Sequence, residues 1–184
     1  MSNVTENKVR FGLKNVYYAI WNGTEYGTPV AIPGAVNLDL DPAGETNKFY
    51  ADNIAYYVSS SNQGYEGSLE IAKIPDSMLK DVWGYTEGAT SKVLTENAEV
   101  EPKAFALLYQ INGDQDNDLF VLYNVTAARP TIGSQTIEEA KEPNTQEFDI
   151  TAAPMADGKV FAKTTKDTPA ATRTNWFTSV FVEA

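Results

Sequence analysis

Short runs of alternating apolar and polar residues, each closed by a turn signal, most constrain what this chain can fold into. Residues 16–21 are aromatic and β-branched, Asn22-Gly23 follows them, and residues 29–32 continue in the same style. Asn-Gly supplies the two positive-φ positions of a tight hairpin turn. We therefore predict a strand, a turn and a returning strand at this point.

The same alternation recurs along the rest of the chain. In residues 65–71, aromatic and aliphatic side chains occupy one face of the expected strand, and acidic or hydroxyl side chains occupy the other. Further strands are expected at residues 36–40, 50–58, 65–71, 104–111, 119–128, 146–151, 159–163 and 176–182.

Only residues 75–83 have the spacing of a helix. Pro75 and Asp76 suit a first turn, the apolar residues recur on one helix face, and Gly84 follows where a C-terminal cap is expected. The sum is a mainly β fold: an antiparallel β-sandwich or partly closed barrel with one flanking α-helix. With no internal repeat and no linker, we predict a single domain over residues 1–184, with an N-terminal arm at 1–8 and a C-terminal strand at 176–184.

Composition removes most catalytic and metal-binding chemistry. The chain has no Cys and no His, which excludes thiolate or imidazole metal sites, His-activated nucleophiles and disulfides. Its 25 acids and 14 bases give a net charge of −11, which disfavours tight binding of nucleic acid. No signal-peptide pattern begins the chain, and no apolar run has membrane-spanning length. We expect a protein made in the cytoplasm, with no membrane partner and no cofactor.

Residues 111–119, INGDQDNDL, place acids at every second position. Asp114, Asp116 and Asp118 match positions 1, 3 and 5 of an EF-hand calcium loop. Leu119 and Val125 occupy the positions where that loop requires a Gly and a bidentate Glu, and the flanking segments are expected strands. We interpret the stretch as a hydrated hairpin tip; a calcium site of another type at a strand tip is the alternative.

Two further patterns admit a functional interpretation. Carboxylates at alternate positions of a strand share a face, so Glu66 with Glu70, or Glu147 with Asp149, would be the pairs available to a glycosidase. Acids opposite an apolar face are, however, what any half-buried strand shows. Exposed aromatic residues would suit sugar stacking or a subunit interface. The candidates are Tyr17, Tyr18, Trp21, Tyr26, Tyr56 and Tyr57.

A set of segments in a fixed order extends over nearly the whole chain. They are VRFGLKNVYYA at 9–19, IPGAV at 32–36, FYADN at 49–53, YEGSLEIAKIP at 65–75, DVWGY at 81–85, FALLY at 105–109, FVLY at 120–123, and FDITAAP at 148–154 followed by Asp157-Gly158. In order and spacing this set resembles the major tail protein family of siphophages. No single segment is diagnostic by itself.

The resemblance implies a structural virion protein and not an enzyme. In that family, tail tube subunits form hexameric rings, the rings stack into a hollow tube, and DNA passes through the lumen on ejection without specific binding. A β-sandwich with a flanking helix contributes strands to an inner barrel shared around the ring. The implied partners are further copies of the chain and the tape-measure, tail-terminator and tail-tip proteins. The implied location is the phage tail of the virion, after synthesis in the host bacterial cytoplasm.

An inner wall dense in carboxylates would repel DNA phosphates and let the duplex slide. Leu69, Ile71, Phe148 and Ile150 would then pack inside the sandwich. The residues that we expect to face the lumen are Glu66, Ser68, Glu70, Glu147, Asp149 and Thr151.

Stacking of rings requires elements that reach beyond one subunit. We expect these to be the loop at 42–49, the acidic hairpin and both termini, so that removing residues 3–8 or 176–184 weakens polymerisation more than folding. The inter-subunit candidates are Asp114, Asp116, Asp118, Trp176, Phe177 and Phe181.

Two other functions stay open from the sequence. The main alternative is a monomeric carbohydrate-binding β-sandwich module with calcium at Asp114, Asp116 and Asp118. A glycosidase with paired acids is the third hypothesis.

Overall fold

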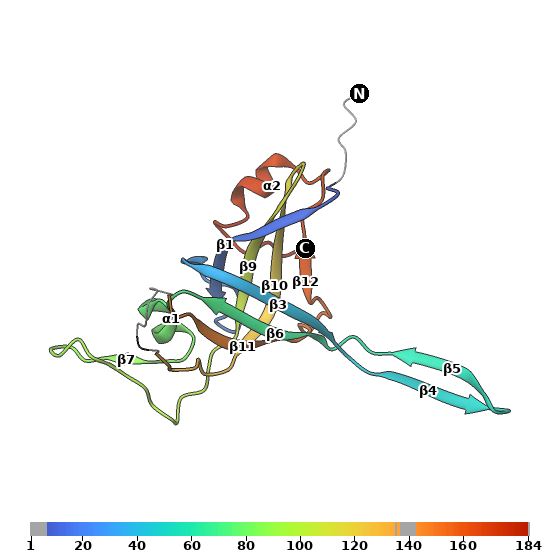
Figure 1. Ribbon diagram of the computed structural model, residues 1–184, viewed down its shortest axis with the longest axis horizontal. Coiled ribbons are helices and arrows are strands. Elements are labelled where there is room, and N and C mark those ends of the chain that lie inside the picture. The colour runs from blue at the N-terminus through green and yellow to red at the C-terminus, as the bar shows by residue number, and fades with distance from the viewer. Residues whose placement is uncertain (1–6, 135, 137–142, 184) are drawn as a thin grey trace.

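Antiparallel strands dominate the computed structural model, which describes residues 7–134, 136 and 143–183. The strands are β1 (Arg10–Ile20), β2 (Val30–Ile32), β3 (Ala35–Ala43), β4 (Thr46–Ala51), β5 (Ile54–Ser60), β6 (Gly64–Ile71), β7 (Thr86–Glu87), β8 (Leu94–Thr95), β9 (Phe105–Gly113), β10 (Asn117–Ala127), β11 (Gln146–Ala152) and β12 (Phe161–Lys163). The helices are α1 (Asp76–Asp81) and α2 (Ala170–Asn175). Eight strands form one sheet in the order β2-β1-β9-β10-β11-β6-β3, with β12 paired to β10. Two separate hairpins, β4-β5 and β7-β8, project from it (Figure 1).

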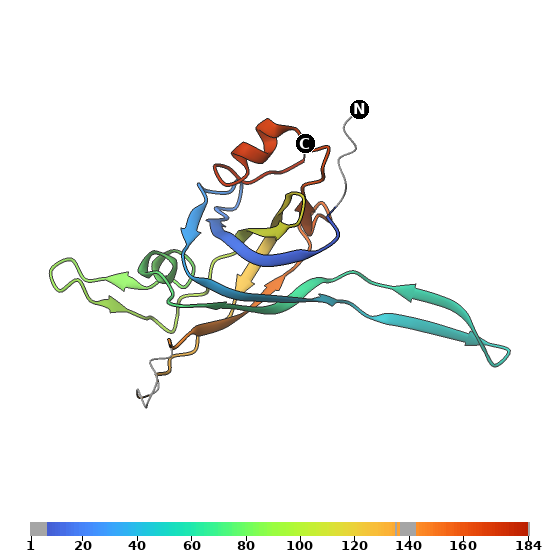
Figure 2. The same cartoon turned by 45° about the horizontal axis from the view of Figure 1, so that its top comes forward.

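The large sheet divides into two layers at β10. The first half of β10 pairs with β12 at residues 120–122, and the second half pairs with β11 at residues 125–127. Between them Asn124 has a φ of 46°, where the register with β9 also shifts; Asn tolerates this left-handed conformation. β1, β9 and β12 therefore cross over β11, β6 and β3 (Figure 2). The predicted sandwich is confirmed, and the sheet does not close into a barrel within the described part of the chain.

The main core lies between the two layers. As predicted, Leu69, Ile71, Phe148 and Ile150 are buried there. The helix predicted at 75–83 is α1, and it closes one end of the core. The Trp83 indole N–H donates to the Ala128 carbonyl at 3.0 Å, and Gly84 follows the helix with a φ of 68°.

A second apolar cluster covers the opposite face of β1, β9 and β10. Because the first part of β9 is buried on both faces, residues 105–109 form an unbroken apolar run and do not alternate. α2 and the chain after it form the cover: the Trp176 indole N–H donates to the Phe120 carbonyl at 3.2 Å, and the Tyr123 hydroxyl donates to the Phe181 carbonyl at 2.6 Å. The C-terminal strand predicted at 176–184 is therefore wrong. Its aromatic residues pack onto a sheet face and do not pair with a strand; residue 184 lies outside the described part.

The first predicted hairpin is confirmed, since Val16 pairs with Ile32 and Tyr18 with Val30. The continuous strand predicted at 50–58 is wrong. Asp52 and Asn53 have φ values of 51° and 63° and form the tight turn between β4 and β5, because Asp and Asn accept positive φ more readily than other side chains. The loop expected at 42–49 is also mostly strand, because β3 extends to Ala43 and β4 begins at Thr46.

Candidate assembly surfaces

One outer face of the sandwich carries a regular array of polar side chains, which we name the acidic face. On β6 and β11, Glu70 lies opposite Glu147, Ser68 opposite Asp149, and Glu66 opposite Thr151. The six residues predicted to face a lumen thus share one face. The structure adds a third row from β3, which sequence reasoning missed because pairing of strands is not visible in one sequence. The full acidic face is Asn37, Asp39, Asp41, Glu66, Ser68, Glu70, Glu147, Asp149 and Thr151.

The acidic face holds six carboxylates and no Lys or Arg. Hydrogen bonds satisfy part of it: the Ser68 hydroxyl donates to Glu147 Oε1 at 2.6 Å, and the Thr145 hydroxyl donates to Glu70 Oε1. Like charges directly opposite on neighbouring strands destabilise a sheet, yet Glu70 faces Glu147 and Glu66 faces Asp41. Folding alone does not explain this array.

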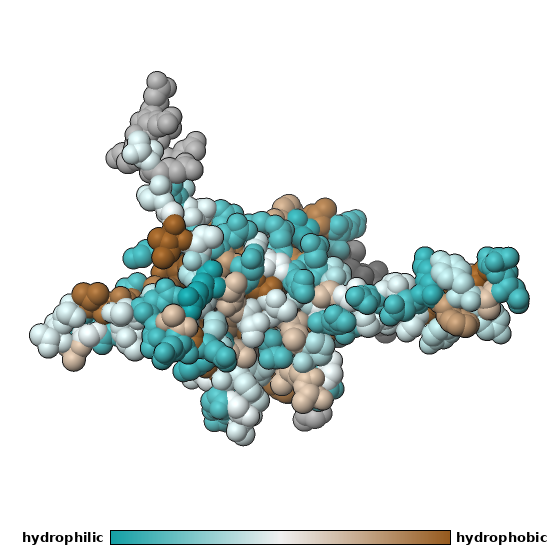
Figure 3. All heavy atoms as spheres, turned by 90° about the horizontal axis from the view of Figure 1, so that it is seen from below, coloured by the Kyte–Doolittle hydropathy of each residue, from teal (hydrophilic) through white to brown (hydrophobic). Residues whose placement is uncertain are grey.

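The hairpin β4-β5, which we name the arm, continues the β3-β6 ladder away from the body. Ser61 N donates to the Glu45 carbonyl and Gln63 N to the Ala43 carbonyl, each at 2.9 Å. A Cβ at Gly44 would lie 2.0 Å from the Ser61 carbonyl oxygen, so glycine permits the two strands to stay paired at this point. Figure 3 shows the arm standing clear of the body at the right of the view, with apolar and polar residues side by side.

Large apolar side chains on the arm have no cover within the described chain. Each is between 52% and 72% exposed, and Phe49 pairs with Tyr57 across the hairpin. The set is Phe49, Tyr50, Ile54, Tyr56, Tyr57 and Val58. Sequence reasoning placed Tyr56 among exposed aromatics but missed the arm; the adjacent Asp52-Asn53 was the signal that would have indicated its turn.

The acidic stretch forms the β9-β10 hairpin tip, as predicted, and its carboxylates contact the same chain. Lys8 N donates to Asp114 Oδ1 at 2.8 Å, which holds the pKa of Asp114 below its usual value. Asp116 pairs with Arg173 at 2.7 Å, and Asp118 lies between Lys163 at 3.1 Å and Arg10. The three carboxylates therefore have different partners, a backbone N–H for Asp114 and basic side chains for Asp116 and Asp118, and do not converge on one ion. Their inter-subunit role stays a prediction.

The N-terminal segment is fastened to this tip. The Asn7 side chain accepts from Gln115 N and Asp116 N and donates to the Asp116 carbonyl, each at 2.9 Å. Residues 1–6 of the predicted N-terminal arm lie outside the described part.

The C-terminal aromatics pack on their own subunit. Trp176 is 3% exposed, Phe181 stacks on it at 5.5 Å between ring centroids, and Phe177 stacks on Tyr17 at 4.9 Å. An interface role for Phe177 and Phe181 stays a prediction, whereas Trp176 has no surface left for a partner.

The proposed sugar-stacking aromatics do not form one platform. Tyr18 is fully buried and its hydroxyl donates to Asp81 at 2.8 Å. Trp21 packs on Tyr26, with 4.7 Å between ring centroids, while Tyr56 and Tyr57 lie on the arm.

The described ranges contain neither a cluster of metal ligands nor a membrane-spanning helix. No three Asp or Glu side chains there are grouped to hold a metal ion. No helix of the described residues has the length and apolar content to cross a membrane.

Comparison with known proteins identifies one matching family and two similar solved structures. A family model described as phage tail tube protein matches residues 19–180. No curated protein matches the chain. A solved anti-feeding prophage cap, a tube-terminating cap, has a TM-score of 0.50 and 10% identity, over 89% of this chain and 98% of that chain. A chain from the sheath-tube complex of an extracellular contractile injection system has a TM-score of 0.43 and 14% identity, over 82% and 88%.

The family match extends over most of the chain, whereas the first structural likeness supports the fold alone and the second is too weak to add to it. Membership implies a location in the phage tail and a structural role, not an enzymatic one. This chain belongs to the phage tail tube protein family.

Proposed function

We propose that this chain is the tube subunit of a siphophage tail, which assembles with itself into stacked hexameric rings and forms the conduit for DNA ejection. Family membership supports the tube role. The observation that carries the conduit is the acidic face, an array of carboxylates on an open sheet surface. Synthesis in the host cytoplasm, and contacts with tape-measure, tail-terminator and tail-tip proteins, belong to the same proposal.

The acidic face has the electrostatics that a DNA conduit requires. Phosphate groups bind proteins mainly through Lys and Arg, and the face offers neither. Repeated by every subunit around a ring, the array would surround the duplex with negative charge and keep it from adhering. In the proposed ring, β3, β6 and β11 contribute to a shared inner barrel with this face toward the axis. Closing the sheets between subunits would also remove the free edge of β3.

The arm supplies the driving force for assembly in this proposal. A two-stranded hairpin with no packed face is marginally stable in water, and this one is covered by nothing in the described chain. Full burial of one large apolar side chain contributes about 1.5 to 3 kcal/mol. Covering several arm side chains on a second copy would therefore support association at about micromolar concentration, which corresponds to roughly 8 kcal/mol.

Electron microscopy of the purified protein tests the proposal. Concentrated protein is imaged in negative stain, and dilute protein is followed by light scattering. We expect rings or hollow tubes that appear with rising concentration. A protein that stays monomeric at all concentrations, also in the presence of preformed tube ends, would contradict the proposal.

A further inference from the structure

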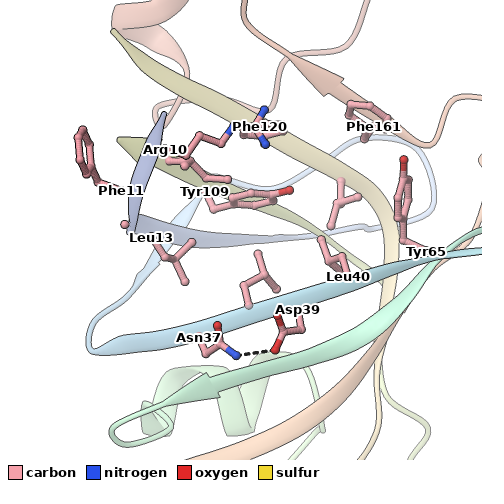
Figure 4. A pocket seen from close by; sticks show the side chains of 14 residues that line it. Arg10, Phe11, Leu13, Asn37, Asp39, Leu40, Tyr65, Tyr109, Phe120 and Phe161 are labelled. Atoms are coloured by element: carbon pink, nitrogen blue, oxygen red, sulfur yellow. Dashed lines mark hydrogen bonds between the residues drawn. The ribbon is translucent and has the colours of Figure 1, made fainter. Parts of the chain in front are cut away.

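An open cleft of about 510 Å³ lies where the two layers of the sandwich diverge (Figure 4). One rim is the start of β1, which pairs with β9 on one side, while β2 reaches only residues 16–18 on the other side. The other rim is β3, which pairs only with β6. Among the described residues, the cleft is thus bounded by two strand edges with unpaired backbone groups.

The cleft is lined mainly by apolar and aromatic side chains. Tyr109 and Phe120 stack at its back with 5.0 Å between ring centroids, and Phe161 meets Tyr65 edge-on at 5.8 Å. Phe161 is 45% exposed and Phe11, at the mouth, is 73% exposed. Figure 4 shows Leu13 on one wall and Leu40 on the other, with the Tyr109 ring between them. An occupant with aromatic and aliphatic side chains would remove this surface from water.

The charged residues at the rims have partners within their own chain. Arg10 pairs with Asp118 at 3.5 Å, and Asp39 belongs to the acidic face and accepts from the Asn37 side chain at 2.6 Å. Apolar surface is therefore what the arm and the cleft can bury together: the arm exposes six large apolar side chains, and the cleft exposes Phe11 and Phe161.

The arm of one copy is directed away from the cleft of that same copy. It extends from the end of β3 and the start of β6 outward from the body into solvent (Figures 1 and 2). A contact between arm and cleft must therefore join two copies. Such a contact uses different surfaces on the two partners, and heterologous contacts of this type propagate into rings or helical stacks.

We infer that the cleft between β1 and β3 receives the tip of the arm from a second copy of this chain. The inference rests on the proposed function and adds the receptor surface to it. The free cleft and the uncovered arm are the two halves of one contact.

Single introduced cysteines test this contact, because the chain has none of its own. Ile54→Cys at the arm tip and Phe161→Cys at the cleft are prepared separately, mixed, assembled and treated with a short bis-maleimide. The matched control replaces Phe161→Cys by Val93→Cys, an exposed position before β8, away from the cleft. We expect covalent dimers from the arm and cleft pair to form at least about tenfold faster than from the control pair, since docking raises the effective concentration.

Phe161→Glu gives a second readout that does not depend on cysteine geometry. We expect it to abolish assembly without changing the melting temperature of the monomer, while Val93→Glu leaves assembly intact. One contrary result is tubes that form while both cysteine pairs cross-link equally, and another is tubes in which Ile54→Cys cross-links only to another surface or to a terminus. Either result would contradict the contact between the arm and the cleft and leave the proposed tube function standing. Absence of any rings or tubes from the unmodified protein would overturn both.

Discussion

The arm continues two of the three strands that carry the acidic face, yet the two regions expose opposite chemistry. Within the body, β3 and β6 alternate between an apolar face packed against the core and carboxylates that are exposed or half-buried. Beyond Gly44 and Gly64 the same ladder continues as the arm, where both faces are exposed and aromatic. In our proposal the acidic face repels DNA, whereas the arm has apolar surface that nothing in the described chain covers and that a second copy would bury. The boundary between these roles is where the second layer of the sandwich ends.

Replacing the arm should have the largest effect on assembly and almost none on the subunit. We propose substituting residues 46–60 by Asn-Gly, because Glu45 and Ser61 already pair at its base and Asn-Gly closes a hairpin. Assembly should weaken by about 100-fold or more, since several buried apolar side chains are lost from the interface. Sedimentation measures assembly and circular dichroism measures melting. A shortened chain that still forms tubes at the original concentration would contradict the role of the arm in assembly.

Replacing a buried aromatic side chain by alanine should destabilise the monomer far more than replacing an exposed aromatic side chain of the arm. Trp176→Ala should lower the free energy of unfolding of the monomer by about 3 to 5 kcal/mol, because Trp176 is buried in its own subunit. Tyr57→Ala on the arm should change it by less than about 0.5 kcal/mol and reduce assembly instead. Urea titration of both variants measures the difference. Equal effects on the monomer would show that the arm packs on its own body.

The same comparison revises an expectation about the termini. Removal of residues 176–184 takes away Trp176 and the Phe181 carbonyl that accepts from Tyr123. It should therefore unfold the subunit, and not only weaken polymerisation as the sequence suggested. Retention of a cooperative melting transition by the truncated chain would contradict this.

Buried tyrosines should make the body sensitive to alkali. Burial is the main cause that raises the pKa of Tyr18, Tyr109 and Tyr123 from 10.0 to about 12. The unfolded chain ionises these groups first, so their stabilising contribution is complete below pH 10 and is lost as pH rises from 10 to 12. We expect a loss on the order of 1 to 3 kcal/mol per tyrosine.

Urea unfolding at several alkaline pH values, with tyrosinate absorbance as a second signal, measures this effect. Tyr109→Phe is the matched control and should lose less stability over the same interval. A free energy of unfolding that stays constant from pH 10 to 12 would be inconsistent with it.

Reversing one charge on the acidic face should have the smallest effect on stability, and it should stabilise the monomer. Glu66→Lys replaces repulsion across from Asp41 by attraction, so the monomer should gain about 0.5 kcal/mol. Tubes that contain Glu66→Lys should retain short duplex DNA, whereas Glu66→Gln tubes should not. A destabilised Glu66→Lys monomer would show that the carboxylates serve the fold.

Alternation and turn residues sufficed to predict the sandwich, α1, and the common face of Glu66, Glu70, Glu147 and Asp149. These features depend on local periodicity, which one sequence contains. The β3 row of the acidic face depends on which strands pair, a long-range property that no local pattern encodes. The arm was missed because residues 50–58 have high strand propensity on both sides of Asp52-Asn53, and propensity does not show where a strand reverses. Trp176 was placed in a strand because aromatic content is equally typical of a segment that covers a sheet.

High-resolution cryo-electron microscopy of the assembled tube tests the central claim most directly, because it fixes which surface of the subunit faces the axis. The account predicts that the carboxylates of Glu70 and Asp149 line the lumen, with the arm of each subunit buried against another copy. A tube with Glu70 and Asp149 on its outer wall, or buried between subunits, would contradict it.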